Sequence, residues 1–102
     1  TVSVKEEPIK KPSLLRVYPN PFNNRIKIFY KVIETGSIYI SIYDIIGKKI
    51  KTIDIQDQSI GWKSAFWDGT NDTGRPVSGG LYLLGLENRD RLERLEKVLY
   101  IK

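Results

Sequence analysis

Residues 38–43, with the sequence Ile-Tyr-Ile-Ser-Ile-Tyr, alternate a β-branched residue with a polar or aromatic one. Successive side chains of a β-strand point to opposite faces, so this period of two places Ile38, Ile40 and Ile42 on one face. β-Branched and aromatic residues at this density favour a half-buried strand. The stretch therefore predicts an antiparallel strand whose isoleucine face lies on a hydrophobic core.

The same period recurs on both sides of this stretch. Residues 26–32 place Ile26, Ile28, Tyr30 and Val32 on one face. Further short strands are expected at residues 14–18, 49–55, 62–67 and 81–86, and in a last strand that closes the chain with residues 97–102. The uneven spacing of Ile50 and Ile53 predicts a β-bulge in the strand at residues 49–55. About seven short strands joined by Gly, Pro and Asn turns predict an all-β fold, an immunoglobulin-like antiparallel β-sandwich.

One segment leaves two interpretations open. Residues 89–96 are charged and rich in good helix formers, and Leu92, Leu95 and Leu99 stand near helical spacing. A single helical turn is therefore an alternative. We favour a hairpin at residues 88–90, because short strands recur at about ten-residue intervals on both sides.

The domain organisation follows from composition. Residues 1–13 mix charges with Pro8 and Pro12, and such a run cannot bury much apolar surface. We expect residues 1–13 to be a linker from an upstream domain and residues 14–102 to be one β-sandwich module. The sequence begins with Thr1 and lacks Met, so we expect a fragment or processed product of a larger protein. No apolar run approaches the ~20 residues that span a bilayer.

The amino-acid composition excludes several kinds of catalytic and metal-binding site. The chain has neither Cys nor His. Disulfides, thiolate metal sites and Ser-His-Asp or Cys-His catalysis are therefore excluded within these residues. We expect no enzymatic activity and no cofactor. Lys and Arg total 17 against 12 Asp and Glu, and the resulting charge of +5 would help contact with acidic surfaces.

Several motifs occur in a fixed order. Residues 18–23, Tyr-Pro-Asn-Pro-Phe-Asn, resemble the opening motif of the C-terminal sorting domains of type IX secretion cargo, type A. They also resemble a closely similar immunoglobulin-like domain related to the flagellar hook-capping protein. Residues 42–48, 67–77, 79–82 and 97–102 resemble the later motifs of the same family, with Gly79 where Ser is usual. The motif residues are Asn20, Pro21, Phe22, Tyr43, Asp44, Gly47, Trp67, Asp68, Gly69, Gly74, Gly80 and Tyr82.

The resemblance implies a module fused behind a secreted cargo protein. In hosts with the secretion system, the resemblance implies a signal read by outer-membrane export machinery, with the cargo passing through the periplasm to the cell surface or the medium. In hosts without that machinery the same domain resembles a passive spacer or assembly module. The alternative is a carbohydrate-binding or spacer module of a secreted glycoside hydrolase.

The motif residues also have a purely structural interpretation, which we favour. Gly47, Gly69, Gly74 and Gly80 stand where turns need positive φ or close backbone approach. Trp67 would lie at the end of the core, and the Tyr82 hydroxyl would bond a neighbouring loop, as in a tyrosine corner.

Exposed aromatic residues offer a second kind of site. If Ala65 and Trp67 face the core, Trp62 and Phe66 face outward and could contact a polysaccharide or the upstream domain. Tyr39 and Tyr43 would also face outward, on another strand, and the sequence does not say whether the two pairs share a surface.

Two further site types are weighed and set aside. Asp68, Thr70, Asn71 and Asp72 carry oxygen ligands, but an EF-hand counted from Asp68 would need Gly and Glu where Thr73 and Gly79 stand. We expect an Asx-rich turn and no metal site. We also expect no nucleic-acid binding, because acidic residues interleave with the arginines near residue 90 and the strand count exceeds that of an OB barrel.

Overall fold

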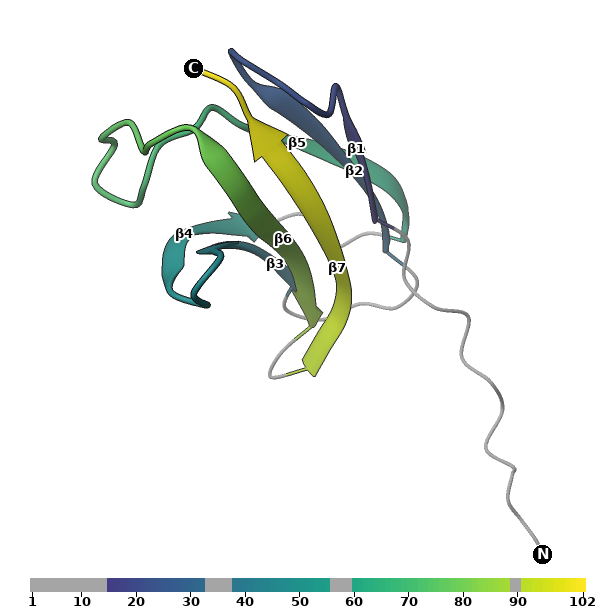
Figure 1. Ribbon diagram of the computed structural model, residues 1–102. Coiled ribbons are helices and arrows are strands. Elements are labelled where there is room, and N and C mark those ends of the chain that lie inside the picture. Colours follow the sequence, from purple (N-terminus) through teal and green to yellow (C-terminus); the bar gives the residue numbers. More distant parts are fainter. Residues whose placement is uncertain (1–14, 33–37, 56–59, 89–90) are drawn as a thin grey trace, which may run out of the picture.

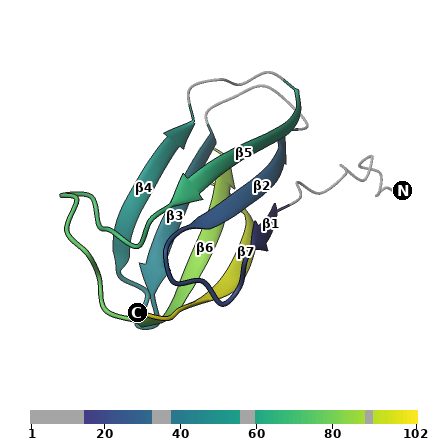
Figure 2. The ribbon, with the colours of Figure 1, turned by 90° about the horizontal axis from the view of Figure 1, so that it is seen from above.

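The computed structural model describes residues 15–32, 38–55, 60–88 and 91–102. They form seven strands and no helix, and therefore no helix that could cross a membrane. The strands are β1 (Leu15–Tyr18), β2 (Ile26–Val32), β3 (Ile38–Asp44), β4 (Lys49–Ile55), β5 (Gly61–Trp67), β6 (Gly80–Asn88) and β7 (Arg91–Tyr100). Two antiparallel sheets, β1-β2-β5 and β4-β3-β6-β7, face each other (Figures 1 and 2). The predicted all-β sandwich is confirmed. The linker predicted at residues 1–13 lies outside the described residues.

The chain crosses between the sheets three times, after β2, β4 and β5. β4 forms a hairpin with β3 and so becomes an edge of the four-stranded sheet. In antibody constant domains the strand at this place pairs instead in the opposite sheet. Lys49 and Lys51 lie in this edge strand, where charged side chains discourage pairing with another chain.

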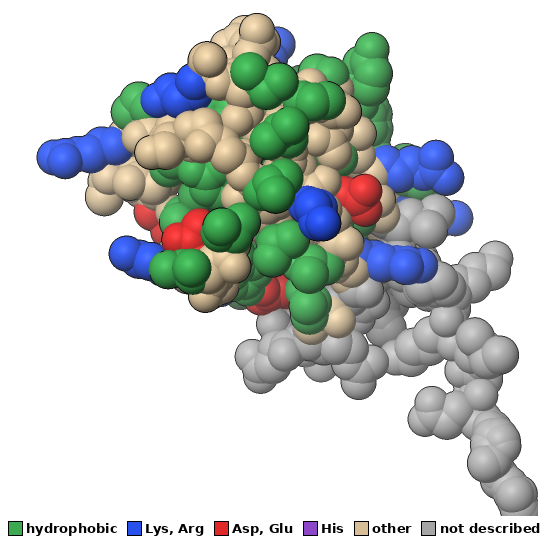
Figure 3. Space-filling model, viewed as in Figure 1, with side chains coloured by type: hydrophobic (Ala, Val, Ile, Leu, Met, Phe, Trp, Pro, Cys, Tyr) green, Lys and Arg blue, Asp and Glu red, His purple; other side chains and the backbone are tan. Residues whose placement is uncertain are grey.

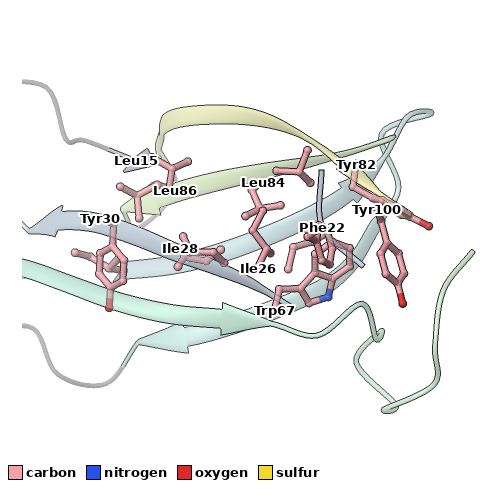
Figure 4. Close-up of a cluster of buried hydrophobic side chains, with 14 of the residues drawn as sticks. Leu15, Phe22, Ile26, Ile28, Tyr30, Trp67, Tyr82, Leu84, Leu86 and Tyr100 are labelled. Atoms are coloured by element: carbon pink, nitrogen blue, oxygen red, sulfur yellow. The ribbon is translucent and has the colours of Figure 1, made fainter. Parts of the chain in front are cut away.

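The core lies between the two sheets and follows the predicted alternation. Ile26, Ile28 and Val32 of β2 are fully buried, as are Ile40 and Ile42 of β3. β6 completes the core with Leu84 and Leu86 (Figure 4), and β7 adds Val98. Burial of these aliphatic side chains is the main force that holds the sheets together.

The predicted bulge is present in β4. Ile42 pairs with Lys51 and Tyr43 pairs with Lys49, so Ile50 is the extra residue. The shift lets Ile50 and Ile53 both pack against the core, although they are separated by an odd number of positions.

The helical-turn interpretation is wrong for residues 91–96, the part of this segment that the structure describes. β7 begins at Arg91 and pairs with β6 from there to Tyr100, with one register shift between Leu86 and Glu87, as the predicted hairpin requires. Residues 89–90 lie outside the described residues. Leu92 and Leu95 stand opposite Glu87 and Gly85 and are about half exposed, so they do not form the buried stripe of a helix. Pairing with β6 outweighs the helix propensity of the segment.

Candidate functional site

Four aromatic side chains gather at one end of the sandwich core (Figure 4). Phe22 stacks on Tyr100 with ring centroids 4.7 Å apart, and Trp67 lies 5.4 Å from Phe22 and 5.3 Å from Tyr82. Trp67 is completely buried, and its indole N–H donates to the Thr70 carbonyl over 2.8 Å. The motif residues Phe22, Trp67 and Tyr82 thus lie together in one cluster, which also contains Tyr100.

Gly69 is required by the Tyr100 ring. A Cβ at residue 69 would lie 2.6 Å from Tyr100 Cζ, far inside van der Waals contact. The backbone at Gly69 also has φ of +79°, a conformation that side chains disfavour. Both the close approach and the positive φ expected from the sequence are therefore confirmed at this glycine.

The opening motif ties the start of the module to its last strand. The Asn20 side chain donates to the Lys97 carbonyl and accepts from the Leu99 amide, both over 3.0 Å. The Phe22 amide then donates to the Leu99 carbonyl, and its carbonyl accepts from the Ile101 amide. Pro21 lies between Asn20 and Phe22 in the sequence, and the Asn20–Pro21 peptide bond is cis. The segment thereby joins one sheet to the edge of the other.

The β3–β4 turn is organised by Asp44. Its carboxylate accepts from the amides of Ile46 and Lys48 over 3.1 and 2.8 Å. Gly47 completes the turn with φ of +90°, as expected. Beside this turn the Tyr43 hydroxyl donates to the Glu87 carboxylate, and this hydrogen bond raises the pKa of Tyr43.

Tyr82 forms the predicted corner. Its ring is buried in the aromatic cluster, and its hydroxyl donates over 2.5 Å to the carbonyl of Ser78, four residues upstream. Burial, followed by the nearby Asp44 carboxylate, raises the pKa of Tyr82. Gly80, at the start of β6, has the expected positive φ.

The acidic loop after β5 uses its oxygens for its own turns. Asn71 Oδ1 accepts from the amides of Thr73 and Arg75, and Gly74 between them has φ of +84°. The Asp68 carboxylate accepts from the Thr70 hydroxyl over 2.6 Å, and this hydrogen bond lowers the pKa of Asp68. The Asx-turn interpretation is confirmed. The described part of the chain contains no group of three His, Cys, Asp or Glu placed to hold a metal ion.

The same loop covers part of the β4 edge (Figure 2). The Asp72 amide donates to the Ile50 carbonyl, and the Asp72 carboxylate accepts from the Thr52 amide, each over 3.0 Å. Lys51 reaches across to the Asn71 carbonyl. The Ile50 carbonyl and the Thr52 amide at the β4 edge are thus paired within the molecule and not left open to another strand.

A second region lies on the outer face of sheet β1-β2-β5. Trp62 and Phe66 are 54% and 45% exposed there, as the alternation of β5 predicts. Tyr39 and Tyr43 belong to β3 in the other sheet, so the two pairs do not share a surface.

Cations accompany these rings. Arg25 lies over Phe66 with 4.4 Å between the guanidinium carbon and the ring centroid. Lys31 Nζ is 5.9 Å from the Trp62 centroid, and Lys27 Nζ is 5.7 Å from that of Phe66. Distances below about 6 Å allow cation–π attraction.

The outer face of the opposite sheet has a different character. Hydrophobic side chains gather over β6 and β7 (Figure 3). Leu81, Leu92, Leu95 and Leu99 are each between a third and a little over half exposed. Exposed apolar surface of this kind often marks a contact.

Sequence reasoning missed Tyr100 and the cations beside Trp62 and Phe66. Tyr100 was signalled by the alternation of Val98 and Tyr100 at the end of the last strand. The cations carry no such signal, because their nearness to the rings depends on the register between β2 and β5.

Comparisons with known proteins agree with this geometry. The family model described as the secretion system C-terminal sorting domain matches residues 16–101. No curated protein matches the sequence closely enough to count as a relative.

Three solved structures share the fold. Dimeric latent PorU from Porphyromonas gingivalis has a TM-score of 0.69 at 17% identity, covering 91% of this chain and 10% of its own. PorZ, a surface component of the type IX secretion system of the same organism, has a TM-score of 0.60 at 19% identity, covering 86% and 11%. FlgD from Xanthomonas campestris, a flagellar hook-capping protein, has a TM-score of 0.60 at 19% identity, covering 87% and 62%. The chain therefore spans only part of each of these proteins.

Proposed function

Because the chain belongs to the family of secretion system C-terminal sorting domains, we propose that it is a non-catalytic sorting module recognised by outer-membrane export machinery. Membership of this family implies export across the outer membrane to the cell surface or the medium. It also implies a linked upstream cargo domain, whose identity and activity lie outside these residues.

The family match over residues 16–101 carries the proposal, because it runs from β1 to the residue after β7. The fates of the polar motif residues support a non-catalytic role. The side-chain oxygens of Asn20 and Asp44 accept hydrogen bonds from backbone amides, as does the carboxylate of Asp72 within the motif at residues 67–77. Groups engaged in this way shape turns and clamp strands, whereas a catalytic group must face a substrate.

The proposal is tested by removing residues 14–102 from the full-length parent protein and fractionating the cells. We expect the truncated cargo to fold and accumulate in the periplasm. The matched control keeps the module and carries Lys48→Gln, a change at an exposed turn residue, and it should be exported normally. Export of the truncated cargo at the control level would refute the sorting role.

The alternative function is a carbohydrate-binding or spacer module of a secreted glycoside hydrolase, and its carbohydrate-binding form would act through Trp62 and Phe66. It predicts that Trp62→Ala abolishes retention on polysaccharide while export continues. The two functions differ in what happens when residues 14–102 are removed, because the sorting role predicts that export is lost and the alternative predicts that export continues.

A further inference from the structure

Charge is distributed unevenly between the two sheets. Residues 15–32 and 60–67, which contain all of sheet β1-β2-β5, include no Asp or Glu. The described acidic residues lie instead in the other sheet and in the loop that follows β5, as Asp44, Asp68, Asp72 and Glu87 illustrate. Every charged side chain in these two ranges is therefore Lys or Arg, although the net charge of the whole chain is only +5.

The cations and aromatic rings alternate across the outer face of this sheet. In the register of β2 and β5, Lys27 stands opposite Phe66 and Lys31 stands opposite Trp62. We call this surface the cationic face, made of Arg16, Tyr18, Arg25, Lys27, Phe29, Lys31, Trp62 and Phe66.

The cations lie within cation–π distance of the rings, which favours their positions before any ligand arrives. Arg25 and Lys27 both lie over Phe66, and Lys31 lies over Trp62. Long cationic side chains normally lose rotamer freedom on binding, and restraint beforehand reduces that cost. An anionic ligand would therefore meet charges that are already positioned.

The spacing of the rings fits a polymer. Trp62 and Phe66 lie four residues apart on one strand, about 13 Å at roughly 3.3 Å per residue. A single sugar is too short to contact both rings, whereas a chain of sugars lying along β5 would contact both.

We propose that the cationic face binds an acidic polysaccharide. The carboxylate or sulfate groups of the polymer contact Arg25, Lys27 and Lys31, while its sugar rings lie against the surface of Trp62 and Phe66 that these cations leave exposed. This role goes beyond sorting and stands without it. It requires only that the module reaches the cell surface or the medium, as family membership implies. Acidic polysaccharides occur at bacterial surfaces, where the module would meet them.

Other ligand classes fit these observations less well. A neutral polysaccharide would contact the rings but gain nothing from the cations. A protein partner is disfavoured because lysine is depleted in the cores of protein interfaces, and Lys27 and Lys31 lie on the central strand of the face. Single-stranded nucleic acid also binds surfaces of cationic and aromatic side chains, so its binding is measured as a competing outcome.

The test measures binding of the purified 102-residue chain by titration calorimetry. The probes are polygalacturonate, dextran sulfate, neutral dextran and an oligothymidylate. Dextran and dextran sulfate share a backbone, so their comparison isolates the charge. We expect binding to the two acidic polymers that weakens with added salt, and none to neutral dextran.

Two double variants separate the face from net charge. Lys27→Glu with Lys31→Glu, and Lys48→Glu with Lys97→Glu, each lower the net charge from +5 to +1, since each substitution removes two units. We expect the first pair to weaken binding by about tenfold or more, because it places like charges against the ligand. The second pair lies outside the cationic face and should retain most of the affinity.

A third variant tests the rings without changing charge. Trp62→Ala should weaken binding roughly two- to fivefold, because it removes a stacking surface and the restraint on Lys31. Thermal unfolding confirms that each variant is folded. If the Lys27→Glu and Lys31→Glu pair unfolds the chain, the corresponding Gln pair replaces it.

Four results would overturn the proposal: no binding to either acidic polymer, equal losses in the two charge-reversed pairs, binding to neutral dextran equal to that of dextran sulfate, or tighter binding to the oligothymidylate. None of them bears on export, which is measured in cells.

Discussion

Gly69→Ala should destabilise the module strongly, for two reasons that can be measured separately. The first is backbone strain, because a side chain at φ of +79° costs about 1–2 kcal/mol. The second is overlap with the Tyr100 ring, whose Cζ would lie 2.6 Å from the new Cβ. Overpacking of this kind costs roughly 1–3 kcal/mol. The expected total is about 2–5 kcal/mol, a large share of the ~5–15 kcal/mol that stabilises a typical domain.

Gly47→Ala is the matched control for the backbone term. Gly47 has φ of +90°, and nothing lies within 4 Å of its ideal Cβ. Backbone strain alone should therefore lower the free energy of unfolding of Gly47→Ala, by about 1–2 kcal/mol. Urea unfolding followed by circular dichroism gives the free energy of unfolding for both variants.

A double-mutant cycle with Tyr100→Ala isolates the contact. Without the tyrosine ring, Gly69→Ala should cost no more than Gly47→Ala does. If Gly69→Ala and Gly47→Ala destabilise the wild-type background equally, the close approach of Gly69 and Tyr100 does not constrain the fold and the reasoning fails.

Three further perturbations test the motif contacts. Asn20→Ala removes two hydrogen bonds to β7 and should lower the free energy of unfolding by about 1–3 kcal/mol, measured by urea unfolding; an unchanged midpoint would refute the clamp. Asp72→Ala should cost about 0.5–1.5 kcal/mol, because the Thr52 amide loses its partner, and concentration-dependent light scattering will show whether the β4 edge then associates. Asp68 has a lowered pKa in the folded state, so the stability that it contributes is present above its unfolded pKa near 3.8 and is lost as the pH falls through the folded value. Asp68→Asn should therefore lose less stability than the wild type when the pH is lowered from 5 to 2, and parallel pH profiles would contradict this.

Much of the fold is predictable from the sequence because its information is local. The alternation in residues 26–32 and 38–43 is enough to identify the buried faces of β2 and β3. The turn around Asp44 and Gly47 is also local, since its hydrogen bonds span at most four residues.

What could not be predicted depends on contacts between distant residues. The ring of Tyr100 fills the space beside Gly69, 31 positions earlier in the chain. The cationic face arises because β2 and β5 pair in one register, and a shift by one residue would send Lys27 and Phe66 to opposite faces. Residues 91–97 have helical propensity, but pairing with β6 decides their conformation.

The most direct test of the central claim is export of a passenger protein. Residues 1–102 are fused behind a folded reporter that carries a signal for passage into the periplasm, and a second fusion carries residues 1–13 alone. Both are expressed in a host with type IX secretion machinery and in an isogenic host without it. We predict that the reporter reaches the cell surface or the medium only with the complete chain and only in the first host. Retention in the periplasm of a protease-resistant, folded fusion in the first host would contradict the account, as would equal export from both hosts.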